Sequence, residues 1–147
     1  MVVATYKLMV DWDADGAFDG VGDTGEDLTA RTFRVEWKRG RDFASQLTGR
    51  SVAGTLRAVV NNESGDYSSF NTGSPLVGNL LPGRKVQLQG GHEGFPYTWP
   101  IVFSDTPLWT GYLLRIQPQP HSGNIRTALL EAIGPLGYLN QRKVSLA

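Results

Sequence analysis

The stretch that decides the fold is residues 33–38, which read FRVEWK. Apolar Phe33, Val35 and Trp37 alternate with a charged residue at every intervening position. A period of two puts the apolar side chains on one side of an extended strand and the charges on the other, so that one side is buried and the other faces water. The alternation predicts a half-buried β-strand here, with Trp37 in the core.

The same period recurs in both directions from this stretch. Alternating apolar residues indicate further strands over residues 6–12, 55–60 and 85–89. Residues 125–133 are apolar on both faces, which is typical of a central or closing strand. One more strand carries an apolar stripe made of Thr110, Tyr112, Leu114 and Ile116.

Residues suited to turns separate these strands. Pro82-Gly83 and the runs at 61–66, 90–94 and 104–107 supply the Gly, Pro, Asn, Asp and Ser that turns favour. Short strands joined in this way fit a small barrel or a sandwich. The barrel is preferred because closure removes exposed sheet edges.

Two segments depart from the strand pattern. Residues 64–82 predict a long ordered loop, in which Pro75 can begin one helical turn after Ser74. Near the end of the chain, Gly134-Pro135 predicts a short helix that begins at proline.

Length and composition exclude several classes of protein. The chain has 147 residues, about one domain, and no cysteine, so disulfide frameworks and thiolate metal sites are excluded. Fourteen Lys and Arg balance fourteen Asp and Glu, which argues against a nucleic-acid binder driven by bulk charge. No apolar run approaches the roughly 20 residues that span a bilayer, and the N-terminus has no secretory signal. We therefore expect a globular β-rich protein without membrane insertion.

An acidic loop follows the first predicted strand. Asp11, Asp13 and Asp15 precede Gly16 with the Asp-x-Asp-x-Asp-Gly spacing of a calcium loop, and Asp19 occupies the ninth position. The twelfth position is glycine where a calcium loop has a bidentate glutamate.

Two interpretations of this loop stay open. Calcium can bind, with Glu26 or Asp27 replacing the missing glutamate after a longer excursion. The favoured alternative is an acidic hairpin loop in which the aspartates cap their own turn amides.

No constellation of residues predicts catalysis. Neither His92 nor His121 neighbours a recognisable serine–acid arrangement, and the chain contains no phosphate-loop motif. The basic cluster of Lys38, Arg39, Arg41 and Arg50 could bind an anion. The favoured interpretation is that these side chains make ion pairs within the fold or with a neighbouring subunit.

Four tryptophans invite a sugar-binding interpretation. Trp12 and Trp37 lie on apolar strand faces and are expected in the core. Trp99 and Trp109 are the better candidates for a surface platform, with Tyr97 beside them.

The order of the motifs resembles the minor tail or tail-tip proteins of long-tailed bacteriophages and prophages, which are related to baseplate hub domains. The motifs are VDWDADGAFDG, VEWKRGRDFASQLTGRSVAGTL, NNESGDYSSFNTGSPLVGNLLPGRKVQL, LWTGYL and ALLEAIGPLGYL. They extend from about Tyr6 to Leu139. The most specific part is the series from Gly65-Asp66-Tyr67-Ser68 to Leu81-Pro82-Gly83-Arg84, followed by Trp109-Thr110-Gly111.

This resemblance implies one hub-like domain over residues 1–147, either a minimal family member or the N-terminal part of a longer protein. The implied fold is mainly β: a small split β-barrel of about seven strands with a long ordered loop and a short C-terminal helix. The implied role is structural, in a homo-oligomeric ring, a trimer or hexamer, around the tail axis. The implied partners are the distal tail ring, the tape-measure protein and host-attachment proteins. We expect no catalysis, no cofactor unless the loop holds calcium, and a location in the virion tail, with assembly in the host cytoplasm.

In such a ring the long loop is expected to lie on the adjacent subunit. The expected contact residues are Arg39, Arg41, Tyr67, Phe70, Leu76 and Arg84. Deleting residues 66–79 should then abolish assembly and leave the barrel folded.

Two other classes compete with this prediction. A carbohydrate-binding or host-surface-binding module would use Tyr97, Trp99 and Trp109 as stacking faces. An oligonucleotide-binding barrel has a similar architecture, but the zero net charge argues against it.

Overall fold

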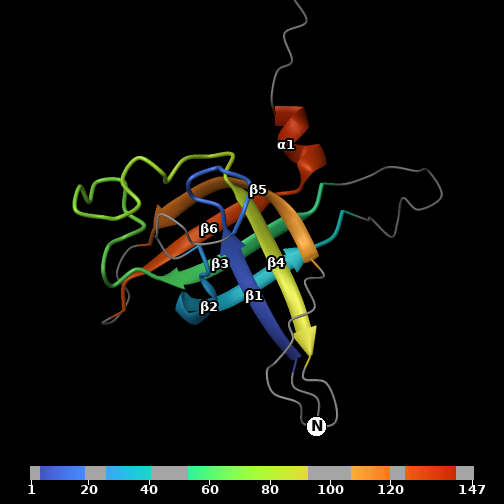
Figure 1. The fold of residues 1–147 in the computed structure, drawn as a ribbon, viewed down its shortest axis with the longest axis horizontal. Helices are drawn as coiled ribbons and strands as arrows, with labels where there is room; N and C mark the ends of the chain where they lie inside the picture. The colour runs from blue at the N-terminus through green and yellow to red at the C-terminus, as the bar shows by residue number, and fades with distance from the viewer. Residues whose placement is uncertain (1–3, 19–25, 41–52, 93–106, 120–124, 142–147) are drawn as a thin grey trace, which may run out of the picture.

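Six antiparallel strands form one curled sheet (Figure 1). The structure, a computed structural model, describes residues 4–18, 26–40, 53–92, 107–119 and 125–141. In chain order the elements are β1 (Ala4–Val10), the 3-10 helix η1 (Thr29–Arg31), β2 (Thr32–Lys38), β3 (Thr55–Asn61), β4 (Lys85–His92), β5 (Pro107–Pro118), β6 (Thr127–Ile133) and the helix α1 (Pro135–Gln141).

The strands are ordered β1-β4-β5-β6-β3-β2, and the sheet curls into a half-barrel. The predicted fold class is therefore confirmed: the protein is mainly β, with a barrel-like sheet and a short C-terminal helix. The described ranges contain six strands where the sequence predicted about seven.

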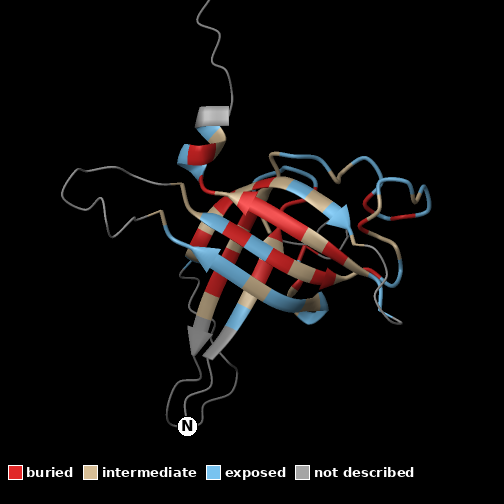
Figure 2. Cartoon of the chain, turned by 180° about the vertical axis from the view of Figure 1, so that it is seen from behind, coloured by how far each residue is buried: buried red, intermediate tan, exposed pale blue. Residues whose placement is uncertain are grey.

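The core fills the inner side of the curl. Directly paired residues lie on the same face of an antiparallel sheet, so the pairing of Leu56 with Ala132 and of Leu8 with Leu88 brings buried side chains together. Each of these four residues is at most 2% exposed. The central strand β6 is buried at alternate positions and also at Glu131, as its mostly red and tan ribbon shows in Figure 2.

Residues 26–31 bridge the gap between the two ends of the sheet. Asp27 pairs with Met9, and the Val10 and Leu28 amides make backbone bonds that hold this segment against the outer edge of β1. The chain then passes through η1 directly into β2, at the opposite edge. This covers part of the β1 edge, whereas β2 has no strand on its far side among the described residues.

The C-terminal helix begins at Pro135, as predicted, because β6 ends at Ile133 and proline suits the first helical position. The Gly134 amide donates to the Gly54 carbonyl at 2.7 Å. Tyr138 of α1 stacks on Tyr112 of β5, with ring centroids 4.6 Å apart. The helix therefore packs on the outer face of the sheet.

The predicted apolar stripe of β5 is wrong in position. The buried residues of this strand are Trp109, Gly111 and Leu113. A bulge between Leu113 and Arg115 then shifts the pairing with β6 by one residue, so that Ile116 faces the core side. The sequence prediction followed one unbroken period through the bulge.

Residues 62–84 are built from turns. Their backbone bonds join each of Asn62, Gly65, Ser68, Asn71 and Ser74 to the residue three positions later. The expected helical turn at Pro75 is instead part of this series, and the Ser74 hydroxyl accepts the Leu76 amide at 3.1 Å.

Candidate functional site

The acidic loop after β1 is organised by Asp11, which is 2% exposed. Its Oδ1 accepts the amide of Ala14 at 2.7 Å, and its Oδ2 accepts the amide of Gly16 at 3.0 Å. Both of these residues have positive φ, so the chain turns sharply around the carboxylate. The interpretation of an aspartate capping its own loop is confirmed for Asp11.

Three acidic side chains converge at the base of this loop. Asp11, Asp13 and Glu26 each offer a carboxylate oxygen, and these oxygens lie within 4.8 Å of one another. Of the other predicted ligands, Asp15 is outside this group and accepts a loop amide at 2.8 Å, and Asp19 lies outside the described residues. Carboxylate oxygens are the ligands that calcium prefers. The group is therefore two loop aspartates plus Glu26, which the segment paired with β1 carries into place.

Of the predicted contact residues in the long loop, two are buried and one is exposed. Tyr67 and Leu76 are each 2% exposed and belong to the core of this chain, so in this fold they offer little surface to a neighbouring molecule. Phe70 is 91% exposed.

The predicted contact arginines are partly engaged within the chain. Arg84 donates to the backbone and side chain of Asn79 at 3.2 and 3.3 Å. Arg39 is exposed and donates to the Leu108 carbonyl at 3.3 Å. Arg41 lies outside the described residues.

The tryptophans are distributed differently from the prediction. Trp12 is buried, as expected, but Trp37 is 44% exposed and Trp109 only 6% exposed. The surface-platform role of Trp109 is therefore wrong, and so is the core position of Trp37. Tyr97 and Trp99 lie outside the described residues.

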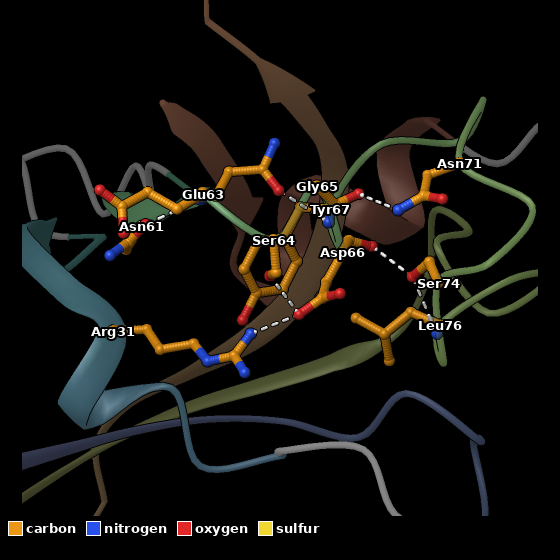
Figure 3. A network of polar contacts seen from close by, with 11 residues as sticks. Arg31, Asn61, Glu63, Ser64, Gly65, Asp66, Tyr67, Asn71, Ser74 and Leu76 are labelled. Atoms are coloured by element: carbon orange, nitrogen blue, oxygen red, sulfur yellow. Dashed lines mark hydrogen bonds and ion pairs between the residues drawn. The ribbon is translucent and has the colours of Figure 1, made fainter. Parts of the chain in front are cut away.

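Side-chain contacts attach the turn series to the sheet (Figure 3). The Tyr67 amide donates to Asn62 Oδ1 at 3.0 Å, and the Ser74 hydroxyl donates to the Asp66 carbonyl at 2.7 Å. Arg31 of η1 forms an ion pair with Asp66 at 2.8 Å. The loop is thus ordered by its own polar groups and tied to the segment that bridges the sheet.

The charges of this network perturb one another. The hydrogen bond from the Ser64 hydroxyl, and next the bond from Arg31, lower the pKa of Asp66. Burial raises the pKa of Tyr67. The Asp66 carboxylate is therefore ionised, and it is bonded to Arg31 and to the Ser64 hydroxyl within the fold.

At the β2 end of the sheet, no further described strand follows, and two apolar residues of β2 are exposed. Val35 and Trp37 pair with Ala58 and Leu56, so they face the core side, but no further strand covers them in the described ranges. Phe33 is the extra residue of a bulge and is 57% exposed. Figure 2 shows β2 largely in the exposed colour, beside the alternating β3. Within the part of the chain that the structure describes, this edge therefore has no strand paired on its outer side, and it carries two exposed aromatic rings.

A row of charges crosses the outer face of the central strands. Glu131 of β6 accepts from Arg57 of β3 at 2.6 Å and also pairs with Arg115 of β5. The hydrogen bonds from Arg115 and then from Arg57 lower the pKa of Glu131. The sequence signal for this triad was weak: one acidic residue inside the apolar run of residues 125–133.

The triad makes stability depend on pH. A carboxyl group whose pKa is lower in the folded chain than in the unfolded chain stabilises the fold at pH values above its ordinary pKa, about 4.3. That stabilisation is lost as the pH falls through the pKa of the folded chain. We expect Glu131→Gln to cost about 1 kcal/mol at pH 7, because both arginines are largely exposed to solvent.

The melting temperature between pH 7 and pH 3 tests this expectation. The fall should be shallower in Glu131→Gln than in the wild type, and unchanged in Glu63→Gln, an exposed control. A Glu131→Gln variant with the full wild-type slope would contradict the assignment.

No protein-family model matches this chain, and a search of curated proteins finds no match. Among the described residues, no helix has the length and apolar character needed to cross a membrane.

Proposed function

We propose that this chain is a structural, non-catalytic subunit of a bacteriophage tail tip or baseplate hub and assembles as a ring around the tail axis. Two features support the proposal. The motifs from about Tyr6 to Leu139 resemble those of tail proteins, and the curled half-barrel sheet agrees with the fold class that the resemblance implies.

The observation that carries the proposal is the outer edge of β2, which no other strand of the described residues covers. An exposed strand edge is a template for pairing with another chain, and proteins that stay monomeric usually cover or shorten it. Here the edge is seven residues long and carries Phe33 and Trp37, both more than 40% exposed. A neighbouring subunit that covers this edge with a different part of its surface makes a heterologous contact, and repetition of that contact generates a ring when the rotation between subunits closes.

The proposed partners follow from this role. A ring subunit would contact the distal tail ring, the tape-measure protein and host-attachment proteins, and would be found in the virion tail after assembly in the host cytoplasm. The proposal includes no direct contact with nucleic acid, in keeping with the zero net charge.

Calcium is part of the proposed role only if the ion changes the measured oligomer. If the ring uses this ion, its ligands within the described residues would be Asp11, Asp13 and Glu26. A change of oligomer on adding calcium or a chelator, lost in Asp13→Asn, would support that role.

Light scattering on the purified chain tests assembly. We expect a trimer or hexamer for the wild type and a weakened oligomer for Trp37→Lys, since a central aromatic contact contributes about 2 kcal/mol, or roughly thirtyfold in dissociation constant. The control is Leu139→Lys on α1, 59% exposed and outside the β2 edge, which should assemble as the wild type does. A folded wild-type chain that is monomeric at all concentrations would contradict self-assembly.

A second experiment tests the location. Antibodies against this chain, applied to phage particles induced from the strain that encodes it, should label the tip of the tail in electron micrographs. Particles that carry no label would remove the tail assignment even if the purified chain forms a ring.

A further inference from the structure

A polar cleft of about 450 Å³ lies between the loop that follows β3 and the ends of β5 and β6. One wall is formed by the turn series, with Ser64, Ser68, Phe70 and Asn71, and the other by Pro118, Gln119, Arg126 and Thr127. The cleft is remote in sequence from β2 and from the acidic loop. It plays no part in the proposed assembly.

Both walls are held by backbone bonds. The Asn62 amide donates to the Arg126 carbonyl at 2.9 Å, and the Gln119 amide donates to the Thr127 carbonyl at 2.9 Å. Within the loop wall, Asn71 Nδ2 donates to the Gly65 carbonyl at 3.2 Å (Figure 3). A site with fixed walls pays little ordering entropy when a ligand binds.

The lining favours a ligand rich in hydroxyl groups. Its uncharged polar side chains are hydroxyls and amides, which both donate and accept hydrogen bonds. Sugar hydroxyls have the same dual character. None of the described lining residues is acidic, and the nearby Asp66 is paired with Arg31 and Ser64, so these residues offer a cationic ligand no free carboxylate.

The single charge on the walls is positive. Arg126 is exposed, and its side chain makes no hydrogen bond or ion pair with any described residue. Guanidinium groups bind carboxylates and phosphates in bidentate geometry. One arginine suits a ligand with an isolated anionic group better than a polyphosphate chain, whose binding needs several cations.

Phe70 supplies the flat apolar surface. It is 91% exposed although the loop that carries it is ordered, and phenylalanine has no polar group that could explain its contact with water. The C–H face of a pyranose ring can stack on such a side chain while its hydroxyl groups reach the neighbouring amides.

From these observations we infer that the cleft binds an anionic saccharide. The sugar ring lies against Phe70, its hydroxyl groups bond to side chains such as Asn71, Gln119 and Thr127, and its carboxylate or phosphate pairs with Arg126. This inference is independent of ring assembly, since neither Phe33 nor Trp37 lines the cleft.

The test is a binding array of purified neutral, uronic-acid and phosphorylated oligosaccharides, with a single-stranded oligonucleotide as a further probe. We expect the wild type to bind members of the uronic-acid or the phosphorylated set, and the two sets distinguish the source of the charge. Phe70→Ala should weaken this binding about tenfold. Arg126→Gln should weaken the anionic ligands at least about tenfold and leave any residual binding of neutral sugars unchanged.

Leu139→Ala is the matched control, because it also removes an exposed apolar side chain, but on α1. It should bind as the wild type does. Phe70 and Arg126 are both exposed, so their variants are expected to fold with wild-type melting temperatures. Failure to bind any saccharide, binding that Phe70→Ala and Arg126→Gln leave intact, or preference for the oligonucleotide would each overturn the inference.

Discussion

Tyr67→Ala is expected to destabilise this protein by about 3–5 kcal/mol, the cost of truncating a buried aromatic side chain. Tyr67 is 2% exposed although it lies in a segment without regular secondary structure. Its ring lies 6.1 Å from that of Trp12, and its amide is bonded to Asn62. Removing the ring opens a cavity where the loop, the acidic-loop segment and the sheet meet. Because domains of this size are stable by only about 5–15 kcal/mol, such a loss is severe.

Urea unfolding of the full chain measures this effect. Phe70→Ala is the matched control, since it changes another aromatic residue of the same loop that is 91% exposed, and it should alter stability by less than about 0.5 kcal/mol. Tyr67→Phe keeps the ring and should cost less than about 1 kcal/mol. A Tyr67→Ala variant within about 1 kcal/mol of the wild type would mean that the loop is not part of the cooperative core.

This expectation changes how the loop must be tested for assembly. Deleting residues 66–79 would remove Tyr67, Leu76 and the ion pair between Arg31 and Asp66 together. The deletion would damage the core as well as any subunit contact, so loss of the oligomer would be ambiguous. An exposed single substitution on the β2 edge, such as Trp37→Lys, tests assembly without this ambiguity.

The strands could be predicted from the sequence because period two depends only on which face of a strand is buried. Residues 33–38 and 55–60 lie in strands as predicted. The position of a strand in the sheet is a different property, set by the order β1-β4-β5-β6-β3-β2. An alternating strand has the same sequence pattern at the edge of a sheet as in its middle. For this reason Trp37, which was expected in the core, is exposed, and Trp109, which was expected on the surface, is buried.

The candidate sites depended on contacts that are distant in the sequence. The acidic loop was visible from its Asp-x-Asp-x-Asp-Gly spacing, but Glu26 reaches Asp11 only because residues 26–28 pair with β1. The polar cleft joins the loop after β3 to the ends of β5 and β6, which are distant in the sequence, so no single stretch of sequence predicts it. Phe70 alone had a sequence signal, as an aromatic residue among small polar ones.

The Trp109-Thr110-Gly111 motif gives the second large expected effect. Residues two apart on a strand share a face, and here the indole of Trp109 lies over the position where Gly111 has no side chain. A Cβ built at Gly111 would lie 2.8 Å from Trp109 Cζ2, and closer still to Trp109 Cη2 and to the Ile133 carbonyl oxygen of β6. The indole is held by the packed core around it, and the carbonyl belongs to the backbone of a central strand. Neither can move without cost.

We therefore expect Gly111→Ala to destabilise the protein by about 3 kcal/mol, at the upper end of the range for overpacking a core. The matched control is Gly73→Ala in the turn series, where the new Cβ would meet only Asn71 Oδ1, at an ordinary 3.5 Å. Because this substitution also restricts the unfolded chain, it should be neutral or slightly stabilising. The urea midpoint at constant m-value measures both.

A further substitution separates the two contacts at Gly111. In the Trp109→Leu background the clash with the indole is gone but the clash with the Ile133 carbonyl remains, so Gly111→Ala should cost less than in the wild type and still be unfavourable. Equal costs in both backgrounds would assign the whole effect to the backbone of β6. A Gly111→Ala variant as stable as the wild type would show that the indole does not pack over this glycine, and the Trp-x-Gly motif would then need an explanation other than the close packing of β5 on the core.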